Sequence, residues 1–148
     1  MFELNAIQPL NLAPVNLEVQ AGEIVALHGP SGSGKTLLLR AIADLEINKG
    51  DALLQGQSRS KMPASRWRQQ VGYLPSESYW WSSLVADHAD HWQLEQLREL
   101  GFPDTAVDWE VARLSSGEKQ RLSLLRSLSI EPRVLLLDEP TANLDAQH

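Results

Sequence analysis

The chain of 148 residues contains no cysteine. This absence excludes disulfide bridges, thiolate metal sites and a thiol nucleophile, and it fits a reducing compartment. Long apolar runs are also absent, since stretches such as residues 134–137 are far shorter than the roughly 20 residues of a membrane-spanning helix. The N-terminus carries an acid where an export signal has positive charge. We therefore expect a soluble cytoplasmic chain whose membrane role, if any, depends on a partner.

Positive charge is scarce, because 13 Lys and Arg stand against 19 Asp and Glu, giving a net charge of -6. The imbalance is concentrated in residues 76–111, which hold eight acidic residues and one basic residue, Arg98. Binding of nucleic acid requires clustered Lys and Arg that neutralise phosphates. We therefore predict no nucleic-acid partner and interpret the acidic segment as a solvated helical face.

The order of short strands and helices predicts an α/β fold in one domain, which a chain of this length can stabilise with a real core. Apolar alternation and short apolar runs predict strands at residues 15–19, 24–28, 51–54, 71–75 and 133–138. Helical periodicity predicts helices at residues 36–46 and 117–129, with a helical turn at 64–70.

Residues 79–113 have a different character. The stretch 84–100 is helical in pattern, and Gly101 and Pro103 interrupt it. We interpret residues 76–113 as a small helical subdomain inserted into a core of residues 1–75 and 114–148. All five tryptophans lie in this insert or just before it: Trp67, Trp80, Trp81, Trp92 and Trp109. His88 and His91 have a spacing used by zinc sites, but a polar helix face is the favoured interpretation.

Residues 29–36, GPSGSGKT, match the phosphate-binding pattern G-x-x-x-x-G-K-[ST] between an expected strand and an expected helix. Gly32 and Gly34 permit backbone conformations that aim N–H groups at an anion, and the helix start adds its positive dipole end. Lys35 would contact the β and γ phosphates of ATP, and the Thr36 hydroxyl would bind Mg²⁺. The predicted ATP-binding residues are Gly29, Pro30, Ser31, Gly32, Ser33, Gly34, Lys35 and Thr36.

A second candidate site is the pair of acids after residues 134–137. Four consecutive apolar residues are expected of a strand buried on both faces of a parallel sheet. Asp138 and Glu139 follow at its carboxyl end, where open α/β sheets bind ligands. Because adjacent strand residues point to opposite faces, we expect two separate roles for these acids. The alternative is a pair of surface acids that merely end a strand.

Residues 114–121, LSSGEKQR, start the last expected helix. Taken alone, Ser115 or Ser116 with Glu118 resembles a capping box. Together with GPSGSGKT before it and VLLLDEPTANLD at residues 134–145 after it, the stretch resembles the signature of the ATP-binding cassette (ABC) family. The resemblance covers most of the chain, from about residue 12. It implies a P-loop NTPase core with a mostly parallel sheet, an N-terminal β segment and an inserted helical subdomain.

The resemblance also implies roles for the acids and the signature. Asp138 would hold Mg²⁺ through water, and Glu139 would act as the general base that polarises the attacking water. In the family, the signature contacts ATP held by a second subunit in a head-to-tail dimer; here its residues are Ser115, Ser116, Gly117 and Glu118. Asp145, in the D-loop pattern, would also face that subunit, although it equally suits a turn that caps the next helix.

The expected function is the ATP-hydrolysing subunit of an ABC transporter, with ATP and Mg²⁺ as cofactors. A permease would hold it on the inner face of the cell membrane, and a second ATPase subunit would complete the dimer. Two alternatives stay open. One is a soluble ABC-type ATPase that is not tied to transport, and the other is a nucleotide-binding remnant without turnover.

The chain departs from the family pattern in several places. Ser116 replaces a signature glycine, and Ser76 stands where the family has a glutamine that touches Mg²⁺. Phe2 is the only aromatic candidate for stacking on adenine before the phosphate loop, so a loose base preference is expected. The family's switch histidine and the strand before it would follow the D-loop, yet His148 lies only three residues after Asp145. We therefore expect a domain that is incomplete at its C-terminus.

Overall fold

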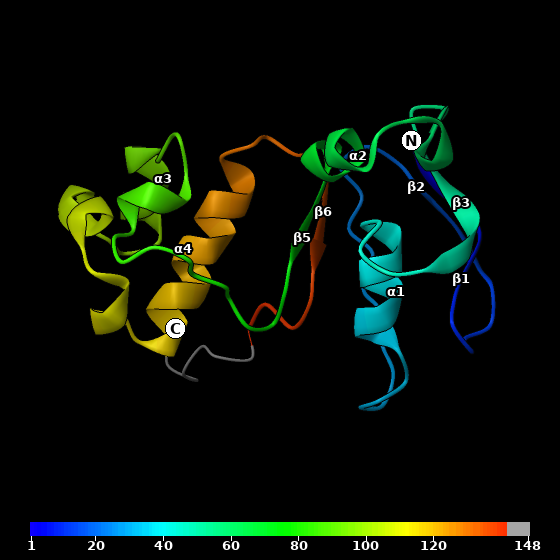
Figure 1. Ribbon diagram of the computed structural model, residues 1–148, viewed down its shortest axis with the longest axis horizontal. Coiled ribbons are helices and arrows are strands. Elements are labelled where there is room, and N and C mark those ends of the chain that lie inside the picture. Colours follow the sequence, from blue (N-terminus) through cyan, green and yellow to red (C-terminus); the bar gives the residue numbers. More distant parts are fainter. Residues whose placement is uncertain (142–148) are drawn as a thin grey trace. The chain divides into compact units, whose positions relative to one another are not determined.

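The computed structural model describes residues 1–141 and divides them into two compact units (Figure 1). Unit 1 contains Met1–Tyr73 and Arg133–Asp138. Unit 2 contains Leu74–Pro132 and residues 139–141. No helix within residues 1–141 is both long and apolar enough to cross a bilayer.

A four-stranded antiparallel sheet forms the N-terminal part of unit 1, in the order β2-β1-β3-β4 (Figure 1). Its strands are β1 (Phe2–Pro9), β2 (Val15–Val19), β3 (Asn48–Leu54) and β4 (Gln57–Ser58). The middle of β1 contains a bulge, where Ala6 has a φ of 52° and the register shifts against both neighbours. Gly50 packs so closely on this bulge that a Cβ atom would lie 2.2 Å from the Ala6 carbonyl oxygen. The strand predicted at residues 15–19 is confirmed.

Unit 1 also contains the α-helices α1 (Lys35–Ile42) and α2 (Ala64–Gln70). The Trp67 side chain of α2 is fully buried, and its indole Nε1 donates to the Ile42 carbonyl oxygen at 2.8 Å. The neighbouring Ala41 carbonyl accepts from Arg59 Nη1 at 2.6 Å. These side chains occupy carbonyl groups that a longer helix would use, and Asp44 adopts a left-handed φ of 60°. The helix predicted to continue to residue 46 therefore ends earlier.

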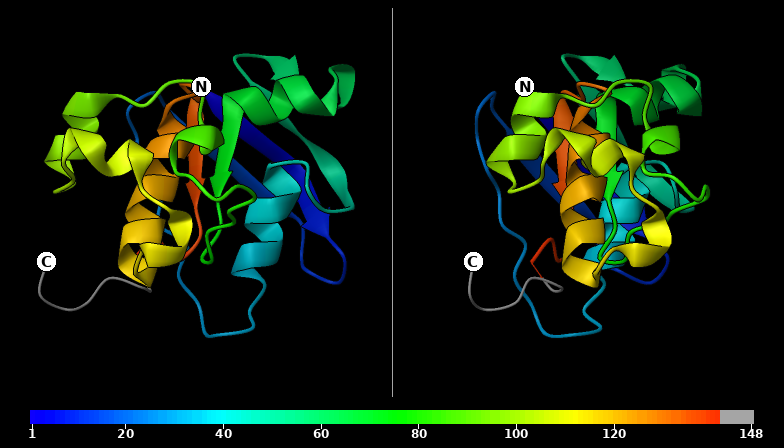
Figure 2. Two further views of the ribbon diagram at one scale, coloured as in Figure 1. Left: turned by 60° about the vertical axis from the view of Figure 1, so that its left-hand side comes forward. Right: turned by 90° about the vertical axis from the view of Figure 1, so that its left-hand side faces the viewer.

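A second sheet pairs β5 (Val71–Leu74) with β6 (Val134–Leu137). Figure 2 shows that the two strands run in the same direction, as a parallel pair. The strand predicted at residues 24–28 is wrong: this segment has no regular structure, and Ile24 is 95% exposed. A strand requires a neighbour for its backbone groups, and none of the described strands pairs with this segment.

Unit 2 is helical, with α3 (Leu94–Glu99) and α4 (Ser116–Leu128) joined to short 3₁₀ turns at Ala86–His88, Asp104–Asp108 and Val111–Arg113. Its core consists of apolar side chains from these elements and the loops between them: Val85, Leu97, Phe102, Ala106, Val111, Leu114, Leu122 and Leu125. The continuous helix predicted over residues 84–100 is wrong. Ala89 is extended and ends the first turn, so α3 starts separately.

His88 holds together the loop that precedes α3. Its side chain is 4% exposed, and Nε2 accepts hydrogen bonds from the backbone N–H groups of Trp81 and Ser82, both at 3.0 Å. Nδ1 lies 2.8 Å from the Leu84 carbonyl oxygen, which can only accept, so the proton of the neutral ring is on Nδ1. Both ring nitrogens are therefore occupied. Among residues 1–141, no group of three or more His, Cys, Asp and Glu could hold a metal ion.

Replacement of His88 by alanine is expected to destabilise the fold by about 1–3 kcal/mol, since two part-buried N–H groups lose their acceptor. The exposed His91→Ala variant is the matched control and should change the free energy of unfolding little. Urea denaturation followed by tryptophan fluorescence measures both. Equal stability of the two variants would contradict the structural role of His88.

Candidate functional site

The glycine-rich loop leads directly into α1, as its sequence predicts. Gly32 and Gly34 both adopt the left-handed region, with φ values of 78° and 93°. Gly34 is also in close contact with Leu12, because a Cβ atom on Gly34 would lie 2.6 Å from the Leu12 Cδ1 atom. A side chain at position 34 would therefore be excluded by both the backbone conformation and the available space.

Lys35 begins α1 and folds back over the loop. Its Nζ donates to the carbonyl oxygens of Gly29 at 2.9 Å and Pro30 at 3.1 Å. Gly34 occupies the N-cap position and has no side chain that could accept from the first N–H groups of the helix. The ammonium group and these N–H groups together form a positively polarised end of α1, which suits an anion such as phosphate.

Asp138 lies at the end of β6 with 4% of its surface exposed. Its Oδ1 accepts from the Thr36 hydroxyl at 3.1 Å, and its Oδ2 accepts from the Tyr73 hydroxyl at 3.1 Å. Within the described part of the chain, no Lys or Arg forms an ion pair with this carboxylate. The structure thus brings together Thr36 and Asp138, which are 102 residues apart.

This buried carboxylate fits a magnesium site. Mg²⁺ prefers hydroxyl, carboxylate and water oxygens, and Thr36 and Asp138 supply the first two. Burying a carboxylate is costly unless a cation or several hydrogen bonds compensate, and among residues 1–141 two hydroxyl groups donate to it. These residues therefore form a reasonable place for a divalent cation.

Tyr73 is the residue that sequence analysis missed. Burial, followed by the nearby charge of Asp138, raises the pKa of the Tyr73 hydroxyl to about 12. The hydroxyl is therefore a hydrogen-bond donor at any ordinary pH. A signal was available, since Tyr73 carries the only polar side chain in the otherwise apolar strand Val71–Leu74.

Glu139 has surroundings different from those of Asp138. It is exposed and adopts a φ of 48°, which is uncommon outside glycine. Such conformations cost of order 1–3 kcal/mol and cluster at functional sites. The chain turns sharply here, so the second carboxylate remains open to solvent while the first is buried.

The signature residues lie in unit 2 at the start of α4. Ser115 and Glu118 form a complete capping box: the Glu118 N–H donates to Ser115 Oγ at 3.2 Å, and the Ser115 N–H donates to Glu118 Oε2 at 2.8 Å. These hydrogen bonds lower the pKa of Glu118 from its usual 4.5, the backbone N–H of Ser115 being the main cause. Ser116 and Gly117 occupy the first helical turn, where N–H groups lack intrahelical partners.

Two further site candidates from the sequence are Phe2, for stacking on adenine, and Asp145, for contact with a second subunit. Phe2 is 6% exposed and packs its ring 6.2 Å from that of Trp67, so it belongs to the core of unit 1 and cannot stack on a base. Asp145 lies outside the described residues.

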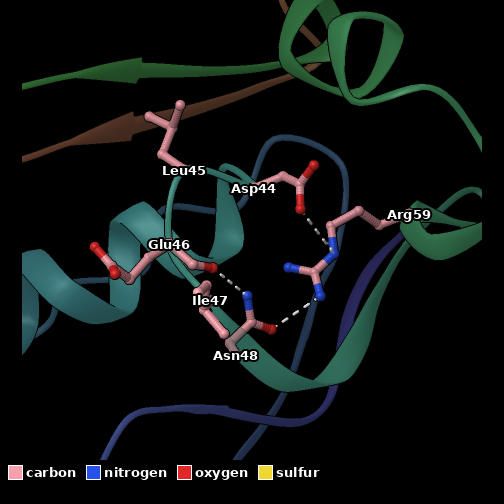
Figure 3. Close-up of a pocket in the computed structure, with 6 residues that line it drawn as sticks. All are labelled: Asp44, Leu45, Glu46, Ile47, Asn48 and Arg59. Carbon is pink, nitrogen blue, oxygen red and sulfur yellow. Dashed lines mark hydrogen bonds and ion pairs between the residues drawn. The ribbon is translucent and has the colours of Figure 1, made fainter.

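A hollow elsewhere in unit 1 is lined by polar and apolar residues around Arg59 (Figure 3). The guanidinium donates to the Ala41 carbonyl, to Asn48 Oδ1 at 2.9 Å and to the Gly50 carbonyl at 3.4 Å. Its Nε lies 3.9 Å from Asp44 Oδ1 and 3.8 Å from Asp51 Oδ1. Figure 3 marks the ion pair with Asp44 by a dashed line. Every nitrogen of Arg59 therefore contacts an oxygen of the chain itself, and the side chain links the end of α1 to β3.

A glycine loop before a helix, with a buried carboxylate at the end of a parallel strand, defines the P-loop NTPase fold. The comparisons with known proteins agree. A bacterial Atm1-family ABC exporter with ATP bound matches 98% of this chain and 30% of its own, with a TM-score of 0.80 and 26% identity. A dimeric ATP-binding cassette bound to ADP and Pi covers 99% of this chain and 77% of its own, with a TM-score of 0.79 at 22% identity, which supports the fold alone.

The family comparison matches residues 12–142 to "ABC transporter", and the chain belongs to this family. Among curated relatives, the probable iron export ATP-binding protein FetA of Escherichia coli (strain K12) is 37% identical over 88% of this chain. The aliphatic sulfonates import ATP-binding protein SsuB of Delftia acidovorans is 41% identical over 91%. The chain spans 64% of the length of FetA and 56% of that of SsuB.

Titration of Glu118 gives a test of the signature cap. Because its pKa is lowered in the folded state, its stabilising contribution is present above pH 4.5 and is lost as pH falls through the folded value. Glu118→Gln keeps the capping geometry without the titrating group. We expect the parent to lose more stability than this variant on acidification below pH 4.5, as measured by denaturation at a series of pH values. Parallel curves for the two proteins would contradict this cap.

Proposed function

We propose that this chain binds ATP with Mg²⁺ and hydrolyses it as the nucleotide-binding subunit of an ABC transporter. The hydrogen bond between Thr36 and Asp138 carries this proposal, because it joins the phosphate loop to the strand-end carboxylate in one site. In this proposal residues 1–75 and 114–148 form the core of a single ATP-binding domain, and residues 76–113 form its helical insert.

The residues of the loop would bind and orient the nucleotide. Backbone N–H groups of residues 29–36 and the start of α1 would surround the β and γ phosphates, with the Lys35 ammonium as a point charge beside them. Thr36 and Asp138 would hold Mg²⁺, Asp138 through a water molecule. When bound, the ion offsets the negative charge of the phosphates.

Glu139 is the proposed general base. Its carboxylate would accept a proton from the water that attacks the γ phosphate, as this step requires an acceptor within hydrogen-bond reach. The exposed position of Glu139 leaves it accessible to water, whereas both oxygens of Asp138 already accept hydrogen bonds. This difference supports the assignment of separate roles.

The partners follow from family membership. The signature residues Ser115, Ser116, Gly117 and Glu118 would contact ATP held by a second subunit, and Asp145 would contribute to the same interface. The solved structure with ADP and Pi that shares this fold is itself dimeric. A membrane permease would hold the subunit on the inner face of the cell membrane, since relatives such as FetA and SsuB are ATP-binding proteins of transport.

Removal of the Lys35 charge tests nucleotide binding. Lys35→Ala should weaken ATP binding by about a hundredfold, since charge-assisted contacts to two phosphates are lost. The control is Lys49→Ala, which removes an exposed lysine from β3 and should bind like the parent. Isothermal titration calorimetry in the presence of Mg²⁺ measures both. Unchanged affinity of Lys35→Ala would mean that the loop does not bind the phosphates.

The Glu139→Gln variant tests turnover separately from binding. It should retain ATP affinity and lose roughly 10²- to 10⁴-fold in rate, the usual contribution of a general base. Glu131→Gln is a matched control, because Glu131 is also exposed and has a positive φ of 50°. Phosphate release gives the rate. If Glu139→Gln hydrolysed ATP at the parental rate, Glu139 would not be the general base. If the parent protein bound ATP but did not hydrolyse it, the chain would be a nucleotide-binding module without turnover.

A further inference from the structure

Tyr73 interacts directly with the carboxylate at the centre of the candidate site. We propose that Tyr73 is a positioning residue for the Mg²⁺ site: its hydroxyl holds one oxygen of Asp138 and so directs the other oxygen toward Thr36 and the ion. This inference rests on the proposed ATP and Mg²⁺ function. It assigns a role to a residue outside the phosphate loop, the strand-end acids and the signature.

The two oxygens of Asp138 have separate donors. The Tyr73 hydroxyl donates to Oδ2 and the Thr36 hydroxyl donates to Oδ1, each at 3.1 Å. The carboxylate has only acceptor oxygens, so both hydroxyl protons must point toward it. Each hydroxyl therefore fixes one end of the same planar group.

A restraint from outside the aspartate is needed. The terminal torsion of an aspartate side chain is broad and roughly two-fold, so the side chain alone does not select the plane of its carboxylate. With Oδ2 held by Tyr73, rotation about this torsion would break a part-buried hydrogen bond. The orientation of Oδ1 is then defined before any ion arrives, which lowers the cost of forming the site.

The location of Tyr73 makes this restraint rigid. Its ring packs against the core cluster of unit 1, and it lies in β5, which pairs with the strand that ends just before Asp138. The donor therefore lies in one strand of a pair, and the acceptor directly follows the other strand. Such support by hydrogen-bonded neighbours is how proteins commonly orient metal ligands.

Tyr73→Phe removes a single oxygen and keeps the ring in the core. We expect the Mg²⁺ concentration for half-maximal ATP binding to rise about tenfold, the effect of losing one hydrogen bond to a charged group. ATP binding measured in EDTA should stay within about twofold of the parent, because the restraint acts only through the ion. Tyr79→Phe is the matched control, since Tyr79 is the only other tyrosine and is 77% exposed.

A double-mutant cycle separates positioning from general stability. In an Asp138→Asn background, which already lacks the carboxylate charge, Tyr73→Phe should cause little further rise in the Mg²⁺ requirement. The melting temperatures of all variants are recorded in parallel. As a second readout, the electron paramagnetic resonance spectrum of bound Mn²⁺ should broaden in Tyr73→Phe as its ligand geometry becomes less defined.

The outcomes of these measurements distinguish a positioning role of Tyr73 from a purely structural one. A raised Mg²⁺ requirement that vanishes in the Asp138→Asn background supports it. An unchanged requirement, with or without a lower melting temperature, overturns it and leaves Tyr73 a purely structural residue. An equal effect in both backgrounds also overturns it. If the parent itself shows no Mg²⁺-dependent ATP binding, the proposed function fails, and this inference fails with it.

Discussion

A carboxylate that leaves water must find hydrogen-bond donors or a cation, and this requirement organises unit 1 around Asp138. Three segments far apart in sequence meet to satisfy it: the start of α1 through Thr36, the strand β5 through Tyr73, and the end of β6 through the acid itself. The glycine loop precedes Thr36 directly. The position of the loop near Asp138 therefore follows from the hydrogen bond of Thr36, one of the two that stabilise the carboxylate.

The opposite end of α1 is held just as firmly, by different means. Trp67 and Arg59 donate to the carbonyl oxygens of Ile42 and Ala41, which are the last groups of the helix. A helix of eight residues has little intrinsic stability, so tertiary contacts at its ends decide where it begins and stops. The phosphate loop is therefore attached to a short helix whose end is fixed by tertiary contacts. Arg59 lines a hollow, but its role there is structural, because it binds the end of α1.

The predictability of each feature depends on how local its cause is. The loop at residues 29–36, the acids that follow β6 and the start of α4 could be identified from sequence, since glycine conformations, capping pairs and apolar runs act over a few residues. The strand predicted at residues 24–28 is absent from the structure, because a strand forms only beside a partner that its own sequence does not specify. The continuous helix predicted over residues 84–100 is also absent. Its start is replaced by the turn that contains His88, whose ring accepts from the backbone of residues 81 and 82, and Ala89 is extended after this turn. Tyr73 was missed because its contact spans 65 residues.

The tryptophans are divided unequally between the two units. Trp67 is the only one within the described part of unit 1, whereas unit 2 contains Trp80, Trp81, Trp92 and Trp109. Trp67 is fully buried and bonded to the last turn of α1, the helix that begins at the phosphate loop. Replacing the four tryptophans of unit 2 by phenylalanine would thus leave a single tryptophan, at the far end of this helix. Its emission would report on order in the loop-bearing unit alone, without any attached dye.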